Sequence, residues 1–140
     1  MIIKQAVCIL FLCSVCFAGS AQTVATVNDL AAKHQQCLDA GIDMTGCSRG
    51  FCAQMDSMLN VVYNNFRTKL NVSGKEVLKK EQIAWLKKRD AYYKNQDKIY
   101  QDNIKSKKWG PDMQMVTYDD KADFIKARVL ALIKRMYQTG

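Results

Sequence analysis

The chain has 140 residues, with 21 lysines and arginines against 13 acidic residues and a formal net charge of +8. This length suits one small domain with a single core, which argues against a second domain. The excess of basic charge favours an anionic partner: nucleic acid inside a cell, or phospholipid headgroups, cell-wall polymers or an acidic protein face outside it.

The first residues have the layout of a secretory signal peptide. Lys4 precedes an apolar run over residues 6–17, and small residues follow over 18–21. The run is shorter than the roughly 20 residues of a transmembrane helix, and no cysteine in it directly follows a small residue, as lipid attachment requires. We expect removal of residues 1–21 and a mature domain over residues 22–140, with an uncleaved anchor as the alternative. Because the protein is expected to be exported, nucleic acid is not expected as its partner.

The mature sequence predicts helices, because apolar residues recur at helical spacing and no stretch alternates long enough for a strand. A first helix is expected over residues 28–40, ended by Gly41. A second is expected to begin at Thr45 or Cys47 and to end at Leu70. Its apolar stripe consists of Phe51, Met55, Leu59, Val62, Phe66 and Leu70.

A long third helix and a fourth are expected in the second half. The stretch Ser73-Gly-Lys-Glu76 has the form of a capping box, which predicts the start of the third helix. Its apolar stripe is expected to pack on the second helix, and it ends within residues 106–111. Asp119 or Asp120 is expected to start the fourth helix. The stripe of the third helix is Leu78, Trp85, Tyr92 and Ile99, and that of the fourth is Ala122, Ile125, Val129, Leu132, Ile133 and Met136. The sequence therefore predicts an all-α, small antiparallel bundle of about four helices.

Few residues suit catalysis. His34 is the one histidine, and the mature chain has no Cys-x-x-Cys pair, nucleophile elbow or phosphate-binding glycine loop. Glu76 and Glu81 are the only glutamates and lie five apart, so they do not face one another on a helix. We therefore expect a binding protein with no catalytic residues, no metal site and no cofactor.

Three cysteines remain after residue 21, at Cys37, Cys47 and Cys52. In an oxidising compartment two of them are expected to pair, which leaves the third either buried or free for another partner. A bridge from Cys37 to Cys47 would close the short loop around Gly41 and fix the turn between the first two helices.

Most of the excess charge lies in residues 64–108, where 13 lysines and arginines stand against 5 acidic residues. Such a strip is either a solvated helix face or a surface for an anionic partner. The candidate binding residues are Lys79, Lys80, Lys87, Lys88 and Lys94.

The sequence contains three motifs that resemble the lysozyme-inhibitor LprI N-terminal-domain family of secreted bacterial envelope proteins. The motifs are Met44-x-x-Cys47, Asp56-x-x-Leu59-Asn60-x-x-Tyr63 and Gln82-x-x-Trp85-x-x-x-Arg89-Asp90-Ala91. Their order and spacing match the family over residues 37–91 and more weakly from Arg128 to the end. The resemblance implies an all-α fold, a periplasmic or secreted setting, and inhibition of lysozyme, another cell-wall hydrolase or a toxin.

The resemblance also bears on the cysteines. Many relatives carry two further cysteines, where this chain has Tyr93 and, near the start of the last helix, about Asp120. The joint loss of both implies that they pair with each other in relatives. The resemblance then implies a bridge between Cys37 and Cys47, with Cys52 as an addition.

The implied activity requires acidic residues. Animal lysozymes of the common type are basic, and the mature chain keeps a net charge of +7 once Lys4 is removed, so the two would repel one another at long range. Inhibition would therefore need a local acidic patch. Its candidates are Asp39, Asp43, Asp119, Asp120 and Asp123. The favoured interpretation is a non-catalytic binding protein, and the alternative is an envelope adaptor that holds an anionic polymer or lipid through its lysine-rich third helix.

One arginine, Arg89, is expected on the apolar face of the third helix. Gln82, Trp85, Arg89 and Tyr92 form one row on the third helix, and Asp56, Asn60 and Tyr63 form a similar row on the second. If these faces pack antiparallel, Asp56 can satisfy the charge and donors of Arg89. We expect this pair to lock the two helices, with Gln82 and Asn60 bonding to backbone or to each other. In the alternative, Arg89 reaches a target.

Overall fold

The computed structural model describes residues 24–139, and these form four α-helices and a short 3-10 helix, η1. The predicted signal peptide lies outside the described residues. The elements are α1 (Val24–Asp39), α2 (Met44–Thr68), α3 (Val72–Lys105), η1 (Pro111–Met113) and α4 (Gln114–Gln138). The predicted all-α bundle is confirmed.

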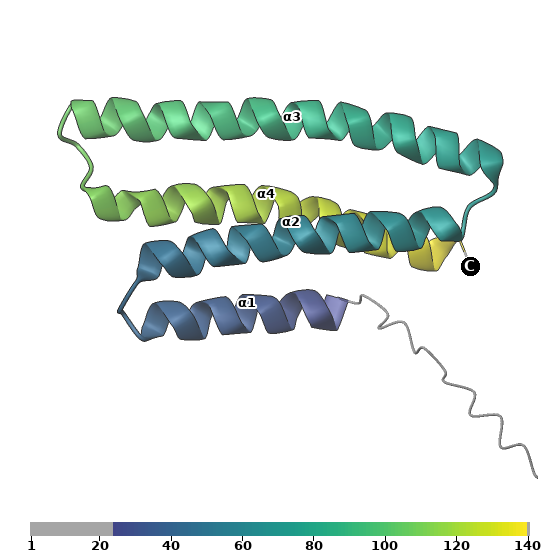
Figure 1. The fold of residues 1–140 in the computed structure, drawn as a ribbon, viewed down its shortest axis with the longest axis horizontal. Helices are drawn as coiled ribbons and strands as arrows, with labels where there is room; N and C mark the ends of the chain where they lie inside the picture. The colour runs from purple at the N-terminus through teal and green to yellow at the C-terminus, as the bar shows by residue number, and fades with distance from the viewer. Residues whose placement is uncertain (1–23, 140) are drawn as a thin grey trace, which may run out of the picture.

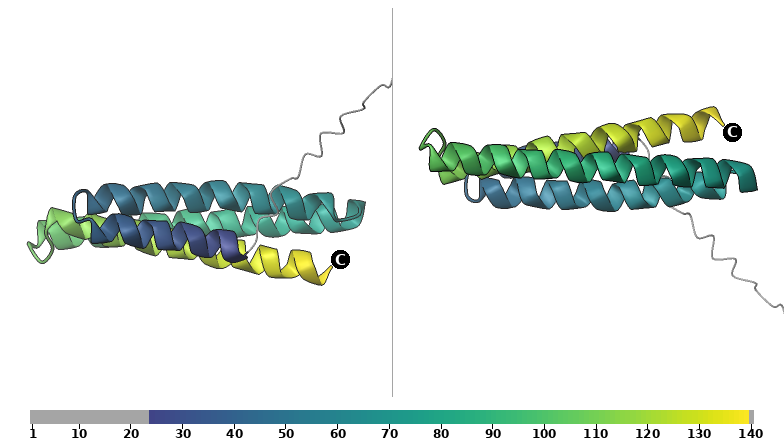
Figure 2. Two further views of the ribbon diagram at one scale, coloured as in Figure 1. Left: turned by 90° about the horizontal axis from the view of Figure 1, so that it is seen from below. Right: turned by 90° about the horizontal axis from the view of Figure 1, so that it is seen from above.

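Each α-helix runs antiparallel to the next one along the chain, as Figure 1 shows. Because two reversals separate them, α2 and α4 run in the same direction. They lie side by side over much of their length and form the centre of the bundle, with α1 on one side and α3 on the other (Figures 1 and 2). The molecule therefore consists of a central pair of helices with one further helix docked at each side.

The core lies mainly between α2 and α4. Both predicted stripes are buried there except for Leu70, which is half-buried, while α1 adds Val27 and α3 adds Leu78. The buried residues are Val27, Phe51, Met55, Met58, Leu59, Val62, Phe66, Leu78, Ala122, Ile125, Val129, Leu132, Ile133 and Met136. Burial of this apolar surface is the main driving force for the fold.

The predicted packing of α3 on α2 is wrong, because α3 lies chiefly on α4. The rings of Trp85 and Tyr92 stack on Phe124 of α4, with centroid separations of 5.6 Å and 4.5 Å. Ile99, at the end of the stripe, is 36% exposed. The periodicity identified the inward face of α3 but not the helix opposite it.

Three predicted helix starts are also wrong. α1 begins at Val24 rather than at residue 28, and α4 begins at Gln114, directly after η1, rather than at Asp119 or Asp120. Asn71 caps α3, since its Oδ1 accepts a hydrogen bond of 2.8 Å from the backbone N–H of Gly74. Ser73-Gly-Lys-Glu76 therefore lies inside the first turn and is not a capping box.

The turn between α1 and α2 is held in two ways. Gly41 has a φ of 69°, a left-handed conformation that glycine adopts without strain. A disulfide then joins Cys37 near the end of α1 to Cys47 in the first turn of α2, with a Cα–Cα distance of 5.8 Å. The bridge fixes α1 against α2, so the position of α1 does not rest on Val27 alone.

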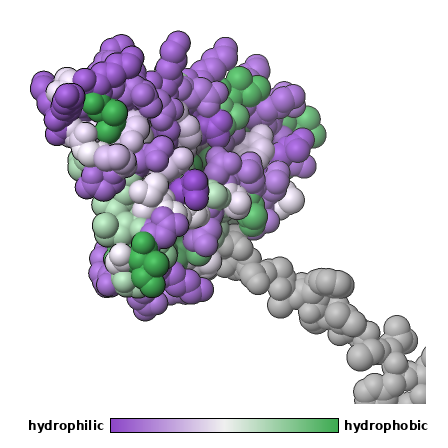
Figure 3. Space-filling view, turned by 60° about the vertical axis from the view of Figure 1, so that its left-hand side comes forward, coloured by the Kyte–Doolittle hydropathy of each residue, from purple (hydrophilic) through white to green (hydrophobic). Residues whose placement is uncertain are grey.

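The exposed surface is mostly polar. On the face shown in Figure 3, hydrophilic residues predominate and apolar residues form separate patches. The most exposed large apolar side chains are Ile42, between α1 and α2, and Val72, at the start of α3, at 91% and 81% exposure. Over residues 24–139, none of the helices combines the length and the apolarity needed to cross a membrane.

The cap of α3 provides a direct test of the corrected helix start. Asn71→Ala removes the side chain that satisfies the N–H of Gly74, so we expect a loss of about 1 kcal/mol in the free energy of unfolding. Ser73→Ala removes an exposed side chain and should change it by less than about 0.5 kcal/mol. Urea denaturation of both variants measures the difference. A larger effect at Ser73 would show that Ser73, and not Asn71, caps α3.

Candidate functional site

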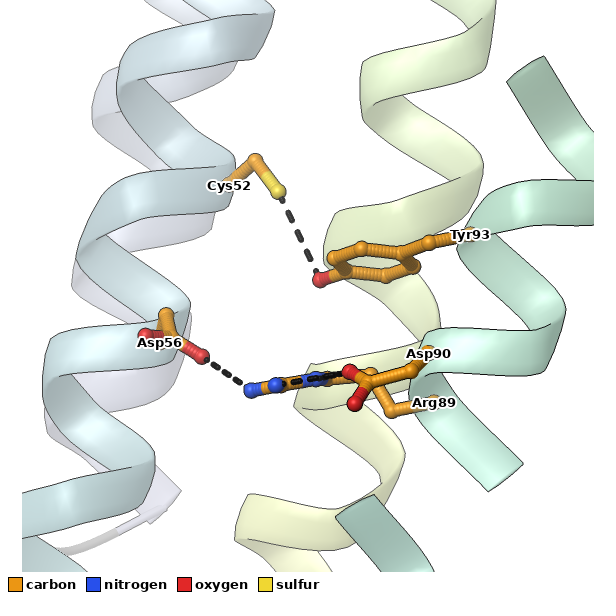
Figure 4. Close-up of polar contacts among 5 residues, drawn as sticks. All are labelled: Cys52, Asp56, Arg89, Asp90 and Tyr93. Atoms are coloured by element: carbon orange, nitrogen blue, oxygen red, sulfur yellow. Dashed lines mark hydrogen bonds and ion pairs between the residues drawn. The ribbon is translucent and has the colours of Figure 1, made fainter. Parts of the chain in front are cut away.

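Arg89 joins α2 to α3 near the middle of both helices (Figure 4). Its Nη1 donates a hydrogen bond of 3.1 Å to Asp56 Oδ1 on α2, while Nε and Nη2 donate to Asp90 Oδ1 at 3.0 and 2.8 Å. Burial acts to lower the pKa of Arg89, but the hydrogen bond and charge of Asp90 and the charge of Asp56 outweigh it and raise the pKa. The guanidinium therefore remains charged between two carboxylates.

The structure thus brings Arg89 and Asp56 together and adds Asp90 to the pair. The arginine side chain is 23% exposed, and the aspartate side chain is 47% exposed. The ion pair therefore lies at the edge of the bundle, where water weakens it relative to a buried pair. Because α2 and α3 otherwise make few contacts, this pair is a main direct link between them.

The expected bonding of Gln82 and Asn60 is wrong. Gln82 is buried, and its Oε1 accepts two hydrogen bonds from Arg128 of α4, from Nε at 3.1 Å and Nη2 at 3.0 Å. The guanidinium of Arg128 also lies over the ring of Trp85, 5.9 Å from its centroid. Asn60 is exposed, and Tyr63 is half-buried against the core. The glutamine and the tryptophan of this motif therefore hold α4 rather than α2.

Two further links between α3 and α4 were not predicted. Lys121, which is 8% exposed, donates a hydrogen bond of 2.5 Å to Asp97, and Arg135 donates one of 2.6 Å to Glu81. The ammonium of Lys121 also lies 5.2 Å from the centroid of the Tyr93 ring. Sequence spacing could not reveal these pairs, because they depend on the register between two helices.

Cys52 is the free cysteine of the described residues. Its Sγ lies 3.8 Å from the hydroxyl oxygen of Tyr93, which extends from α3 toward α2 (Figure 4). Burial raises the pKa of the Cys52 thiol, and burial together with the neighbouring Cys52 raises the pKa of Tyr93. Both groups therefore stay protonated at neutral pH, which is unsuitable for a nucleophilic thiolate.

A groove between α1 and α4 gathers carboxylates. Asp119 and Asp123 line it. Asp120 is not part of this lining; it lies near Tyr92 of α3, whose pKa is raised by burial and by the charge of Asp120. On the α1 side, Gln35 lines the groove and donates a hydrogen bond of 2.8 Å to Asp39. We call this feature the acidic groove; its lining residues are Ala31, His34, Gln35, Leu38, Phe51, Asp119, Asp123 and Lys126.

The remaining acidic candidate, Asp43, lies in a neighbouring hollow beside the disulfide. Its Oδ1 accepts a hydrogen bond of 2.8 Å from the backbone N–H of Gly46, and it is the N-cap of α2. The structure therefore brings Asp119 and Asp123 to the lining of the acidic groove, with Asp39 bonded to its lining residue Gln35. Asp120 lies outside the lining, and Asp43 has a capping role.

His34 connects three helices without forming a catalytic triad. Its Nε2 lies 3.2 Å from Ser48 Oγ on α2 and 3.2 Å from Asp119 Oδ1 on α4, and its ring stacks on Phe51 at 4.4 Å. A triad needs the nucleophile and the carboxylate on different ring nitrogens, and Ser48 is fully buried. Within residues 24–139, no group of three or more histidine, cysteine or acidic residues could hold a metal ion.

The lysine candidates lie apart from these contacts. Each is exposed on α3, whereas the residues that hold α3 to its neighbours lie on the inner side of the same helix. The lysine candidates are Lys79, Lys80, Lys87, Lys88 and Lys94.

The environment of Cys52 predicts that its thiol reacts slowly with alkylating reagents. Because burial raises its pKa, Cys52 should react with iodoacetamide at about pH 8 much more slowly than a free cysteine, which is partly ionised there. After unfolding in urea the rate should rise to the ordinary value. Mass spectrometry of the labelled, non-reduced protein measures this rate, and fast labelling of the native protein would contradict the protected position.

The link through Arg89 predicts a coupled effect on stability. We expect losses of about 1–2 kcal/mol for Arg89→Ala, which removes two carboxylate contacts, and about 0.5–1 kcal/mol for Asp56→Ala. The double variant should lose less than the two single variants together, by about 0.5 kcal/mol. Urea denaturation measures all three, with exposed Arg49→Ala on α2 as the control. Strict additivity would show that the two side chains do not support one another.

Comparison with known proteins assigns the chain to a protein family. The model of the family described as "Lysozyme inhibitor LprI" matches residues 18–132. No curated protein and no solved structure matches the chain. The matched range includes the link between α2 and α3, the disulfide and the acidic groove, and it takes in most of the sequence. The chain therefore belongs to the lysozyme inhibitor LprI family.

Proposed function

We propose that the protein is an exported, non-catalytic inhibitor that binds a basic lysozyme or another basic cell-wall hydrolase through the acidic groove. Membership of the lysozyme inhibitor family supports the class of activity. The observation that carries the proposal is that Asp119 and Asp123 line the groove and that Asp39 is bonded to Gln35 at its α1 side. A basic enzyme needs such a surface, because the chain as a whole is basic.

The distribution of charge allows a basic partner to approach one side. The acidic groove lies between α1 and α4, whereas α3 lies on the side of the bundle away from α1 (Figure 1). At physiological ionic strength the Debye length is about 8 Å. A partner that contacts the groove is therefore affected mainly by the nearby carboxylates and by Lys126, and only weakly by the lysines of α3.

The groove is also held rigidly, which favours binding. The disulfide fixes α1 against α2, and His34 contacts both Ser48 of α2 and Asp119 of α4. A preformed surface loses little conformational entropy when a partner binds. An inhibitor of this kind needs no catalytic residues, only a surface complementary to the active-site cleft of the enzyme.

A matched pair of charge variants tests the groove. The mature chain should slow the lysis of bacterial cell walls by a basic lysozyme, and Asp39→Asn with Asp123→Asn should weaken this inhibition about tenfold, or about 1.4 kcal/mol. Glu76→Gln with Asp112→Asn makes the same change in net charge away from the groove lining. This control should retain full inhibition.

The groove variant should remain folded. Asp39 and Asp123 are both exposed, and substitutions at exposed positions usually change the free energy of unfolding by less than about 0.5 kcal/mol. Equal losses of inhibition in the two double variants would contradict the role of the groove, and no effect of the mature chain on any basic wall hydrolase would contradict the proposed function.

A further inference from the structure

The outer side of α3 carries a straight row of lysines. Lys80, Lys87 and Lys94 are seven residues apart, and so are Lys98 and Lys105. Seven residues rise about 10.5 Å along an α-helix and turn back by only about 20°, so these side chains stay on one side for about 37 Å. All five are exposed. We call this row the basic face.

Most carboxylates of α3 pair with residues outside the basic face, although exposed Glu76 lies one turn before Lys80. Asp90 is paired with Arg89 and Asp97 with Lys121, while Glu81 is paired with Arg135. Within the row, Lys98 is paired with Asp102 one turn away. Among residues 24–139, no ion pair is formed by Lys80, Lys87, Lys94 or Lys105.

We propose that the basic face binds a linear phosphodiester polymer of the cell envelope. Charges repeated along a straight helix match charges repeated along a chain better than they match a single small anion. The face has lysines but no arginine, since the one arginine of α3, Arg89, is held between Asp56 and Asp90. Lysine binds phosphate as a point charge, whereas bidentate recognition of planar carboxylates favours arginine.

The composition of the basic face argues against a lipid bilayer as its partner. A helix that lies on a membrane inserts large apolar side chains such as Trp, Phe or Leu. The large aromatic residues Trp85 and Tyr92 of α3 instead stack on Phe124 of α4, inside the bundle. The exposed large apolar residues beside Lys80 are Val77 and Ile83, at 52% and 48% exposure. This leaves little to enter a bilayer, and no aromatic ring on which nucleic-acid bases could stack.

The basic face is separate from the acidic groove, because α3 and α1 lie on different sides of the central helices (Figure 1). Polymer binding therefore does not depend on the proposed inhibition. One molecule could hold a wall polymer with α3 while α1 and α4 remain open to a protein. Such an arrangement would concentrate the protein where wall hydrolases act.

The experiment uses the mature chain and poly(glycerol phosphate) as the probe, with affinity measured by calorimetry over a range of salt concentrations. Replacing Lys80, Lys87, Lys94 and Lys105 with glutamine should lower affinity at least about tenfold and flatten the salt dependence, since fewer counterions are released. The control replaces Lys33, Arg49, Arg67 and Lys134 with glutamine, an equal change of charge at exposed positions of other helices. Its affinity should stay within about threefold of the unchanged chain.

The other outcomes would overturn the proposal. Equal losses of affinity in the two quadruple variants would show that the polymer is attracted to net charge rather than to the basic face. No binding of the unchanged chain to the polymer would show that the basic face is not such a site. Tighter binding to phosphatidylglycerol vesicles or to duplex DNA would assign the face to a different partner. Inhibition of a lysozyme by the glutamine variant of the basic face should be unchanged, which separates this proposal from the acidic groove.

Discussion

The bundle depends on the burial of the apolar stripe of α2 against that of α4. These two helices supply most of the core, and each outer helix is attached to them by a different kind of contact. α1 buries Val27 and is fixed by the disulfide from Cys37 to Cys47. α3 buries only Leu78 and Gln82, so it relies on stacked rings and on polar pairs. Removal of the central contact would separate α1, which is fixed to α2, from α3, which lies chiefly on α4.

The sequence predicted the inward faces of the helices better than it predicted their partners. The spacing of Met55, Leu59 and Val62 identifies a buried stripe, because only one side of a helix can face a core. For α3 the same signal is ambiguous, since a stripe does not specify which helix covers it. The answer depended on Phe124 and Arg128, which lie on a second side of α4 that contacts α3. Periodicity along α4 emphasised its other, more apolar side.

The candidate sites show the same limit. Arg89 and Asp56 could be matched from sequence because both stand in rows of one helical face, and a charge on such a face needs a partner. The pairs of Lys121 with Asp97 and of Arg135 with Glu81 have no comparable local signal. The acidic groove was anticipated only as a set of aspartates, since Asp39 and Asp123 come from helices that are far apart in sequence.

The polar pairs of α3 have a further consequence for function. They engage three of the five carboxylates of α3: Glu81 and Asp97 are held by side chains of α4, and Asp90 by Arg89. The same contacts that hold α3 on the bundle therefore leave most lysines of the basic face without an ion pair among residues 24–139. Because the attaching residues lie on the inner side and the lysines on the outer side, the outer surface can change without loss of the fold. Stability and surface charge are in this way assigned to opposite sides of one helix.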